Sequence, residues 1–177
     1  MKLTRLKLAF IVCLGVLFMH LQPVQSFAAT SGGDDMSIVT AEDPNVLLDV
    51  AKGFGSAELS KLDNGTPIIY GRVDGIKYGV YFYGCDSKGE KCKTIQFAAS
   101  WETKKFTIDD VNTWNKDKRF GKVYLDREGE PVIEFDVNLT FGVTRKNLDD
   151  TFDWWMNVVK SFAKVVSEKS APTPPAS

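Results

Sequence analysis

Histidine is almost absent from this sequence, and the single copy lies close to the N-terminus. The one histidine among 177 residues is His20. Histidine is the side chain best suited to proton transfer near neutral pH, and it is a common zinc ligand. If the first segment is removed, as the next features predict, the processed chain has no histidine. That loss disfavours histidine-dependent catalysis and zinc sites built on imidazole.

Other signatures of catalysis and of metal binding are also missing. The sequence has no nucleophile motif and no glycine-rich phosphate loop. Asp126, Glu128 and Glu130 lie in one short stretch, but their spacing lacks the distant glutamate of an EF-hand loop, which favours a plain hairpin turn. We therefore expect a protein that is not an enzyme and that uses no metal and no cofactor.

Residues 1–29 have the order of a secretory signal peptide. Three basic residues precede an apolar run over residues 8–19, and small residues follow near Ala28 and Ala29. The run is shorter than the roughly 18 residues that favour a membrane span. An uncleaved anchor is the alternative. We expect cleavage near Ala28/Ala29 and a periplasmic or secreted protein with no membrane span after cleavage.

The charge of the processed chain disfavours nucleic acid as a partner. Loss of residues 1–29 removes three of 22 basic residues and leaves 19 against 23 acidic ones, a net charge of −4. Binding to a phosphate backbone relies on clustered lysine and arginine, which this balance does not supply. The partner that remains is a protein or a second copy of the chain.

Two cysteines remain after cleavage, and their spacing predicts a disulfide. Six polar, turn-forming residues separate Cys85 from Cys92. In an oxidising compartment such a close pair favours a bond that closes a hairpin loop. A redox-active or metal-binding pair is the alternative, but six intervening residues fit neither a C-x-x-C motif nor the usual zinc spacing.

Composition divides the processed chain into three parts. Residues 30–42 are polar and glycine-containing, which predicts a flexible leader. Residues 43–167 carry the apolar periodicity of one domain. Residues 168–177 are rich in proline and predict a disordered tail.

Hydrophobic periodicity predicts an α+β domain of two layers. The expected order is a helix, three strands, a helix, two strands and a long helix, with a mostly antiparallel sheet of five strands. The expected elements are a helix capped by Asp43, strands over 67–73, 76–83 and 93–101, a helix capped by Thr107, strands over 122–126 and 132–139, and a helix capped by Thr144.

Two surfaces are candidates for binding. If the last two strands are neighbours, Tyr124, Glu134, Asp136 and Asn138 share one face of the sheet, and Gln96 and Ser100 can join them. This face is a simple solvated surface, a partner-binding surface or, as the rival interpretation, the acid–base site of an enzyme. The tyrosines of residues 78–83 could stack on a ligand ring, but we expect them to serve core and cross-strand packing.

The long last helix offers the second surface. Trp154 and Trp155 are adjacent, so they cannot face the same core, and Trp155 belongs to the main apolar stripe. Trp154, Val158 and Val165 form a second apolar line at steps of four and seven. A dimer mate, another protein or the chain's own second helix could cover this line. The alternative is that Trp154 packs only on a neighbouring loop.

Several segments resemble the YbjN-domain family, over roughly Leu47 to Phe162. The most specific segment is the run VNTWNKDKRFGKVYLD. The matching pieces are the cysteine pair, Gln96–Ala99, Trp101, Val111–Asn115, Arg119–Asp126, Glu134–Asp136 and Gly142–Thr144 with the helix that follows.

The resemblance implies a fold and, in outline, a role. The family is labelled a bacterial sensory transduction regulator, and its fold is similar to that of type III secretion chaperones, which are dimers that bind extended segments of client proteins. No catalytic residues carry over. We therefore expect an exported accessory or binding protein that is chaperone-like or regulatory. Its partner is another protein or, in a homodimer, a second copy of the chain. A structural component of an envelope assembly is a further alternative.

Overall fold

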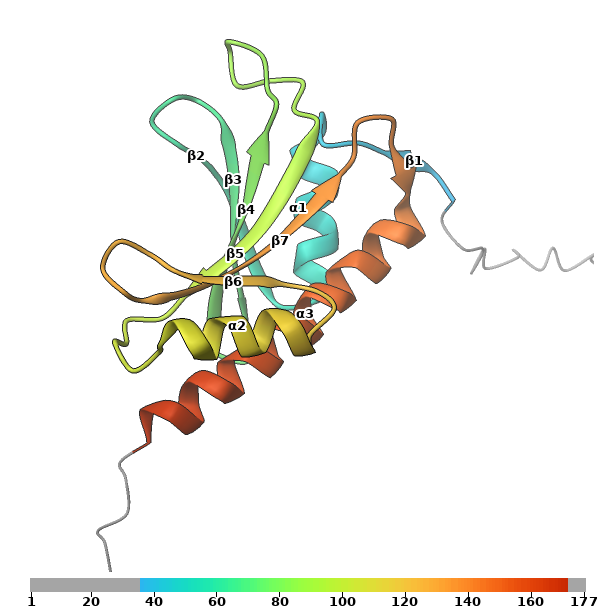
Figure 1. The fold of residues 1–177 in the computed structure, drawn as a ribbon. Coiled ribbons are helices and arrows are strands. Elements are labelled where there is room, and N and C mark those ends of the chain that lie inside the picture. The colour runs from blue at the N-terminus through green and yellow to red at the C-terminus, as the bar shows by residue number, and fades with distance from the viewer. Residues whose placement is uncertain (1–35, 172–177) are drawn as a thin grey trace, which may run out of the picture. The chain divides into compact units, whose positions relative to one another are not determined.

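The structure is a computed structural model that describes residues 36–171 (Figure 1). The expected signal peptide, the first six residues of the leader and the last six residues of the chain lie outside the described residues. The described elements are β1 (Ile38–Val39), α1 (Pro44–Gly53), β2 (Ser56–Lys61), β3 (Pro67–Val73), β4 (Ile76–Tyr83), β5 (Thr94–Ser100), α2 (Ile108–Asp117), β6 (Lys122–Leu125), β7 (Pro131–Asn138), β8 (Val143–Thr144) and α3 (Arg145–Ser170).

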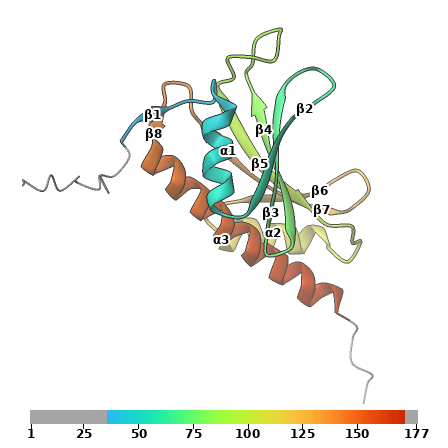
Figure 2. The same ribbon diagram turned by 180° about the vertical axis from the view of Figure 1, so that it is seen from behind.

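The described domain is built on one antiparallel sheet with helices on one side. The sheet has six strands in the order β2-β3-β4-β5-β7-β6, and a separate two-stranded sheet joins β1 to β8. Figure 2 shows α1 and α3 lying together across the same face of the large sheet. The predicted α+β class and the mostly antiparallel sheet are confirmed.

The expected number of five strands was wrong, because the sequence analysis missed β2. This strand has only Ala57 and Leu59 as apolar residues, at alternate positions among serine, glutamate and lysine. It pairs with β3 from Ser56 opposite Arg72 to Lys61 opposite Pro67. Pairing with an apolar neighbour, rather than its own hydrophobicity, explains why this segment is extended.

All three helices begin where the sequence indicates. The Asp43 carboxylate accepts a hydrogen bond from the backbone N–H of Asn45 at 3.0 Å, and Pro44 occupies the first helical position. Thr107 and Asp110 form a reciprocal capping box. At the third helix, the Thr144 hydroxyl accepts from the N–H of Asn147 at 3.1 Å.

Both expected boundaries of the domain differ from the structure. At the start, β1 pairs with β8, and Val39 and Ala41 are buried, so residues 38–41 belong to the packed domain rather than to a flexible leader. At the end, α3 continues to Ser170 instead of stopping at residue 167. The Lys169 ammonium lies 2.6 Å from the Asp110 carboxylate of α2, which holds the last turn of α3 in place.

Aromatic rings form the centre of the core between the sheet and α3. Phe97 of β5 is fully buried, stacks on Trp155 at 5.3 Å between centroids and meets the edge of Phe152 at 4.8 Å. Further along α3, Phe162 packs against Trp114 of α2 at 4.9 Å. These contacts fix α3 on the sheet and attach α2 to its C-terminal half. Among residues 36–171, no helix is long and apolar enough to cross a membrane.

Candidate functional site

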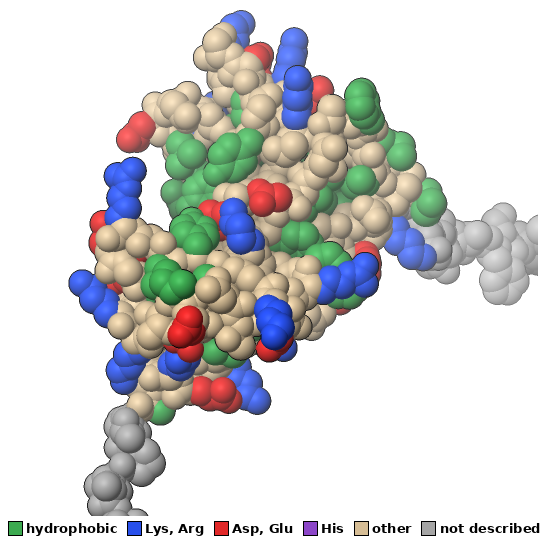
Figure 3. Space-filling view, in the orientation of Figure 1, with side chains coloured by type: hydrophobic (Ala, Val, Ile, Leu, Met, Phe, Trp, Pro, Cys, Tyr) green, Lys and Arg blue, Asp and Glu red, His purple; other side chains and the backbone are tan. Residues whose placement is uncertain are grey.

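The face of the large sheet opposite α1 and α3 is rich in tyrosine. Four of the five tyrosines lie on this face, while Tyr78 points into the core. The four are Tyr70, Tyr81, Tyr83 and Tyr124. Figure 3 shows this face, where hydrophobic-class side chains border a small group of acidic and basic side chains. We call it the tyrosine face. Tyr83 is 48% exposed, so its ring borders solvent while its hydroxyl makes a cross-strand contact with Gln96.

Hydrogen bonds connect the side chains of the tyrosine face across β4, β5 and β7. The Tyr83 hydroxyl donates to Gln96 Oε1 at 3.2 Å, and Gln96 Nε2 donates to Asp136 Oδ1 at 2.8 Å. Gln96 lies directly opposite Asp136 in the register of β5 and β7. The arrangement holds the amide and the carboxylate in fixed positions beside an exposed aromatic ring.

A second group on the same face links β6 to β7. The Tyr124 hydroxyl donates to Glu134 Oε1 at 2.8 Å, and the Lys122 ammonium lies 2.7 Å from Glu134 Oε2. Because β6 and β7 are neighbours, the expected grouping of Tyr124, Glu134 and Asp136 on one face is confirmed. Whether these residues bind a partner stays a prediction.

The electrostatics of these tyrosines disfavour acid–base chemistry. Burial, followed by the hydrogen bond with Glu134, raises the pKa of Tyr124 to about 12. Burial, and then the charge of Glu134, also raises the pKa of Tyr83. Both hydroxyls are therefore protonated near neutral pH and act as hydrogen-bond donors. A group that keeps its proton so firmly is poorly matched to general acid–base catalysis at pH 7.

The second predicted surface is largely covered by the chain itself. Val158 and Val165 are partly buried and pack against the core. Trp154 is 45% exposed, and its ring lies 4.8 Å from that of Phe120, in the connection that follows α2. Of the covers left open for the line of Trp154, Val158 and Val165, the structure shows the chain's own α2 region over part of it.

What remains beside Trp154 is a shallow hollow of about 230 Å³. Trp154 and Val158 both line it, and Val165 does not. Its other lining residues include Trp114, Lys118, Arg119 and Phe120. Phe120 was missed by the sequence analysis, because it lies in a connection with no periodic pattern.

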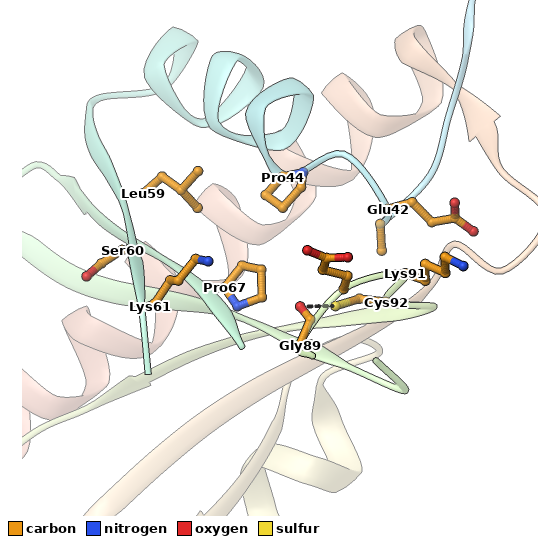
Figure 4. A pocket seen from close by; sticks show the side chains of 11 residues that line it. Glu42, Pro44, Leu59, Ser60, Lys61, Pro67, Gly89, Lys91 and Cys92 are labelled. Carbon is orange, nitrogen blue, oxygen red and sulfur yellow. Dashed lines mark hydrogen bonds between the residues drawn. The ribbon is translucent and has the colours of Figure 1, made fainter. Parts of the chain in front are cut away.

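A larger pocket, of about 400 Å³, lies where α1 begins, next to β2 and the cysteine loop. Figure 4 shows side chains from these separate segments pointing toward one space. Its apolar lining residues are Ala41, Pro44, Leu59, Pro67 and Cys92. Charged residues at the pocket are Glu42, Lys61, Glu90 and Lys91, two of each sign. We call this the β2 pocket.

The disulfide forms part of the wall of the β2 pocket. Cys85 and Cys92 are bonded, as the spacing predicted. Cys92 is buried, and its neighbours Gly89, Glu90 and Lys91 line the same pocket. The bond therefore fixes one side of the pocket as well as closing the loop. Three parts of the chain that are distant in sequence, residues 41–44, 59–67 and 89–92, make this pocket, so no local motif pointed to it.

The two borders of the large sheet differ in how their backbone groups are satisfied. At β6, the side-chain amide of Asn115 donates to the carbonyl of Val123 and accepts from its N–H, both at 2.9 Å. The side chain of Asn115 thus occupies the place that another strand would take. At β2, within the described part of the chain, the backbone is hydrogen-bonded only to β3. β2 therefore presents an unpaired edge.

No group of three or more histidine, cysteine, aspartate or glutamate residues within residues 36–171 is placed to hold a metal ion. The chemistry that the described side chains offer is hydrogen bonding, ion pairing and apolar contact.

Comparison with known proteins supports a regulatory rather than catalytic family. A search among curated proteins found no match. The model of the YbjN family, described as "Putative bacterial sensory transduction regulator", matches residues 43–168. The match spans the described domain from the cap of α1 to the last turns of α3. Because it covers more than half of the sequence, the chain belongs to the YbjN family.

Proposed function

We propose that the protein is an exported, non-enzymatic accessory protein that works like a chaperone, holding an extended segment of a partner protein along β2. The observation that carries the proposal is the unpaired edge of β2 beside the β2 pocket. An extended segment can add to a free edge by backbone hydrogen bonds, which give affinity, while pockets beside the edge select side chains. Both requirements meet in this one region.

The alternation of side chains along a strand explains how the pocket would select the bound segment by its side chains. Successive side chains of an added strand point to opposite faces of the sheet. Those on the helix side would lie next to Leu59 and Lys61, which line the β2 pocket. A pocket of about 400 Å³ lies within the size range of ligand sites in proteins, and is large enough to admit an apolar side chain.

The charges around the pocket make apolar contact the main basis of selection. Glu42 and Glu90 are matched by Lys61 and Lys91. With equal numbers of each sign, the rim gives little net preference for a charged segment. We therefore expect bound segments to share an apolar residue that enters the pocket, and to vary in charge.

Export belongs to the proposal, and residues 1–29 support it through their charged, apolar and small-residue order. Mass spectrometry of the protein recovered from its compartment should find a new N-terminus near Ala29 or Thr30. Recovery of a membrane-bound chain that still begins at Met1 would support an uncleaved anchor instead.

Site-specific photo-crosslinking in intact cells tests the binding surface. A photoreactive residue at Glu58, which is exposed in β2, should crosslink to a partner. The same residue at Asn112, exposed on α2, is the matched control and should not. The peptide recovered from the crosslink should carry an apolar residue. Equal crosslinking from both positions would contradict the proposal.

A substitution in the pocket separates apolar recognition from edge pairing alone. Leu59→Glu places a charge in the β2 pocket and should reduce the Glu58 crosslink. Ile108→Glu makes the same kind of change at an apolar residue that is 62% exposed on α2, and should leave it unchanged. Melting curves of both variants establish that the fold is retained. An unaffected crosslink in folded Leu59→Glu would remove the pocket from the proposal.

A further inference from the structure

The tyrosine face already binds one ammonium group, and this group belongs to the chain itself. The Lys122 Nζ lies 2.7 Å from Glu134 Oε2 and 5.6 Å from the centroid of the Tyr124 ring. A carboxylate and an aromatic ring thus hold the cation from two directions. This is the combination by which proteins bind ammonium and guanidinium groups.

The same combination recurs nearby without a resident cation. Tyr83 offers a half-exposed ring, and Asp136 offers an exposed carboxylate. Gln96 connects them, through bonds of 3.2 Å to the Tyr83 hydroxyl and 2.8 Å to Asp136. Among the described residues, no lysine or arginine forms an ion pair with Asp136. Lys122 is close enough to interact electrostatically with Asp136, but its hydrogen bond is to Glu134.

The charge of this half of the face is complementary to a cation. Over β5, β7 and β6, the carboxylates of Glu134, Asp136 and the nearby Asp126 face a single ammonium, that of Lys122. The basic residues Arg72 and Lys77 lie at the other half, on β3 and β4. An incoming positive group is therefore favoured beside Asp136 over a negative one.

We propose that Tyr83 and Asp136 form a binding site for a lysine or arginine side chain of a partner polypeptide, which would lie on the tyrosine face as Lys122 does beside Tyr124 and Glu134. The ring of Tyr83 supports the cation, and the carboxylate of Asp136 neutralises it. Gln96 keeps the two groups in position before binding, which reduces the ordering cost. This site lies on the opposite face of the sheet from the β2 pocket and is independent of the proposal above.

The probe for the test is a hexalysine peptide, added to the mature chain labelled with ¹⁵N. Titration should shift the side-chain amide signals of Gln96, which lies between the two binding groups. Asp136→Asn should raise the Kd about twofold to fivefold, because it removes the charge of an exposed ion pair while leaving the Tyr83 ring in place. The same spectra show whether each variant is folded.

A charge-matched control separates a site from general attraction. Asp150→Asn removes one negative charge from an exposed residue of α3 and should leave the Kd unchanged. Equal weakening by Asp136→Asn and Asp150→Asn would overturn the proposal. So would shifts of the Gln96 amide with maltohexaose, a neutral oligosaccharide, and none with hexalysine.

Removing the resident lysine gives a second, opposite test. Lys122→Met vacates the group of Tyr124 and Glu134, so the face gains a second place for an ammonium. Hexalysine should then bind at least about twofold more tightly than to Lys116→Met, which makes the same charge change at an exposed position of α2. Identical Kd values for the two lysine variants would contradict the inference that Lys122 occupies the cation site formed by Tyr124 and Glu134.

Discussion

Two adjacent tryptophans of α3 should differ sharply in what they contribute to the free energy of unfolding. Trp155 is fully buried, stacks on Phe97 and meets the edge of Tyr78 at 6.0 Å. A buried aromatic side chain removes about 150–250 Å² from water, and truncation of such a residue to alanine costs about 3–5 kcal/mol. We expect Trp155→Ala to lower the free energy of unfolding by about 4 kcal/mol.

Trp154 should contribute about half as much. It is 45% exposed, and its main ring contact is Phe120 at 4.8 Å. Roughly half of its surface is therefore withdrawn from water, which at about 25 cal/mol per Å² corresponds to about 2–3 kcal/mol. Because Phe120 lies in a connection that can adjust, we expect Trp154→Ala to cost about 1–2 kcal/mol.

Urea unfolding of the oxidised protein measures both losses, since the midpoint and slope give the free energy of unfolding. Trp155→Phe keeps a ring in the core and serves as the folded reference if the alanine variant is too unstable. Sedimentation of Trp154→Ala at several concentrations reports whether this side chain also takes part in self-association. Equal losses from Trp154→Ala and Trp155→Ala would refute the assignment of one to the core and the other to the surface.

Three further predictions concern single groups. The Tyr78 hydroxyl is buried with no hydrogen-bond partner in the described chain, so Tyr78→Phe should be neutral or stabilise by up to about 1 kcal/mol in urea unfolding. Burial raises the pKa of Tyr78 from 10 to about 12, so the stability that its protonated form contributes is complete below pH 10 and is lost as the pH rises through 12. Tyr78→Phe should therefore reduce the loss of unfolding free energy at alkaline pH. An unchanged dependence of stability on pH would contradict this. Maleimide should label neither Cys85 nor Cys92 under denaturing, non-reducing conditions, and labelling of the wild type would contradict the disulfide. Cys85→Ser should lower the free energy of unfolding by about 2–3 kcal/mol. Asn115→Ala removes two hydrogen bonds to Val123 and should cost about 1–3 kcal/mol in the same unfolding assay, whereas no loss would show that water replaces them.

Local signals in the sequence were sufficient for the centre of the sheet and for the helix starts. β3 and β4 occupy the predicted residues, because apolar and aromatic runs flank the tight Asp74–Gly75 turn. Asp43, Thr107 and Thr144 cap the helices as expected, since capping depends on residues only two or three positions apart.

Elements that depend on distant partners could not be predicted in this way. β1 has two residues and exists because Ile38 and Val39 pair with Thr144 and Val143, more than a hundred positions later. β2 has too few apolar residues to stand out by itself. Both are extended because of where the rest of the chain places their partners.

The candidate sites differ in the same respect: one depends on local sequence patterns and the others on distant partners. The tyrosine face follows from the alternation of β5 and β7, so the grouping of Tyr124, Glu134 and Asp136 was accessible from the sequence. The β2 pocket was not accessible from the sequence, because its walls come from three distant parts of the chain that meet only in the fold. For Trp154, the sequence left packing on a neighbouring loop open as one alternative, but it could not identify Phe120, since this residue lies in an irregular connection.

The unequal borders of the large sheet also limit how many molecules can be joined through it. Growth of a sheet from copy to copy into a fibre requires each molecule to offer two open edges, one for the molecule before it and one for the next. Within residues 36–171, the amide of Asn115 satisfies the outward N–H and C=O of Val123 in β6, whereas β2 is paired to β3 alone. Edge pairing is therefore favoured at β2 over β6, which favours one guest or one symmetric pair over a growing fibre.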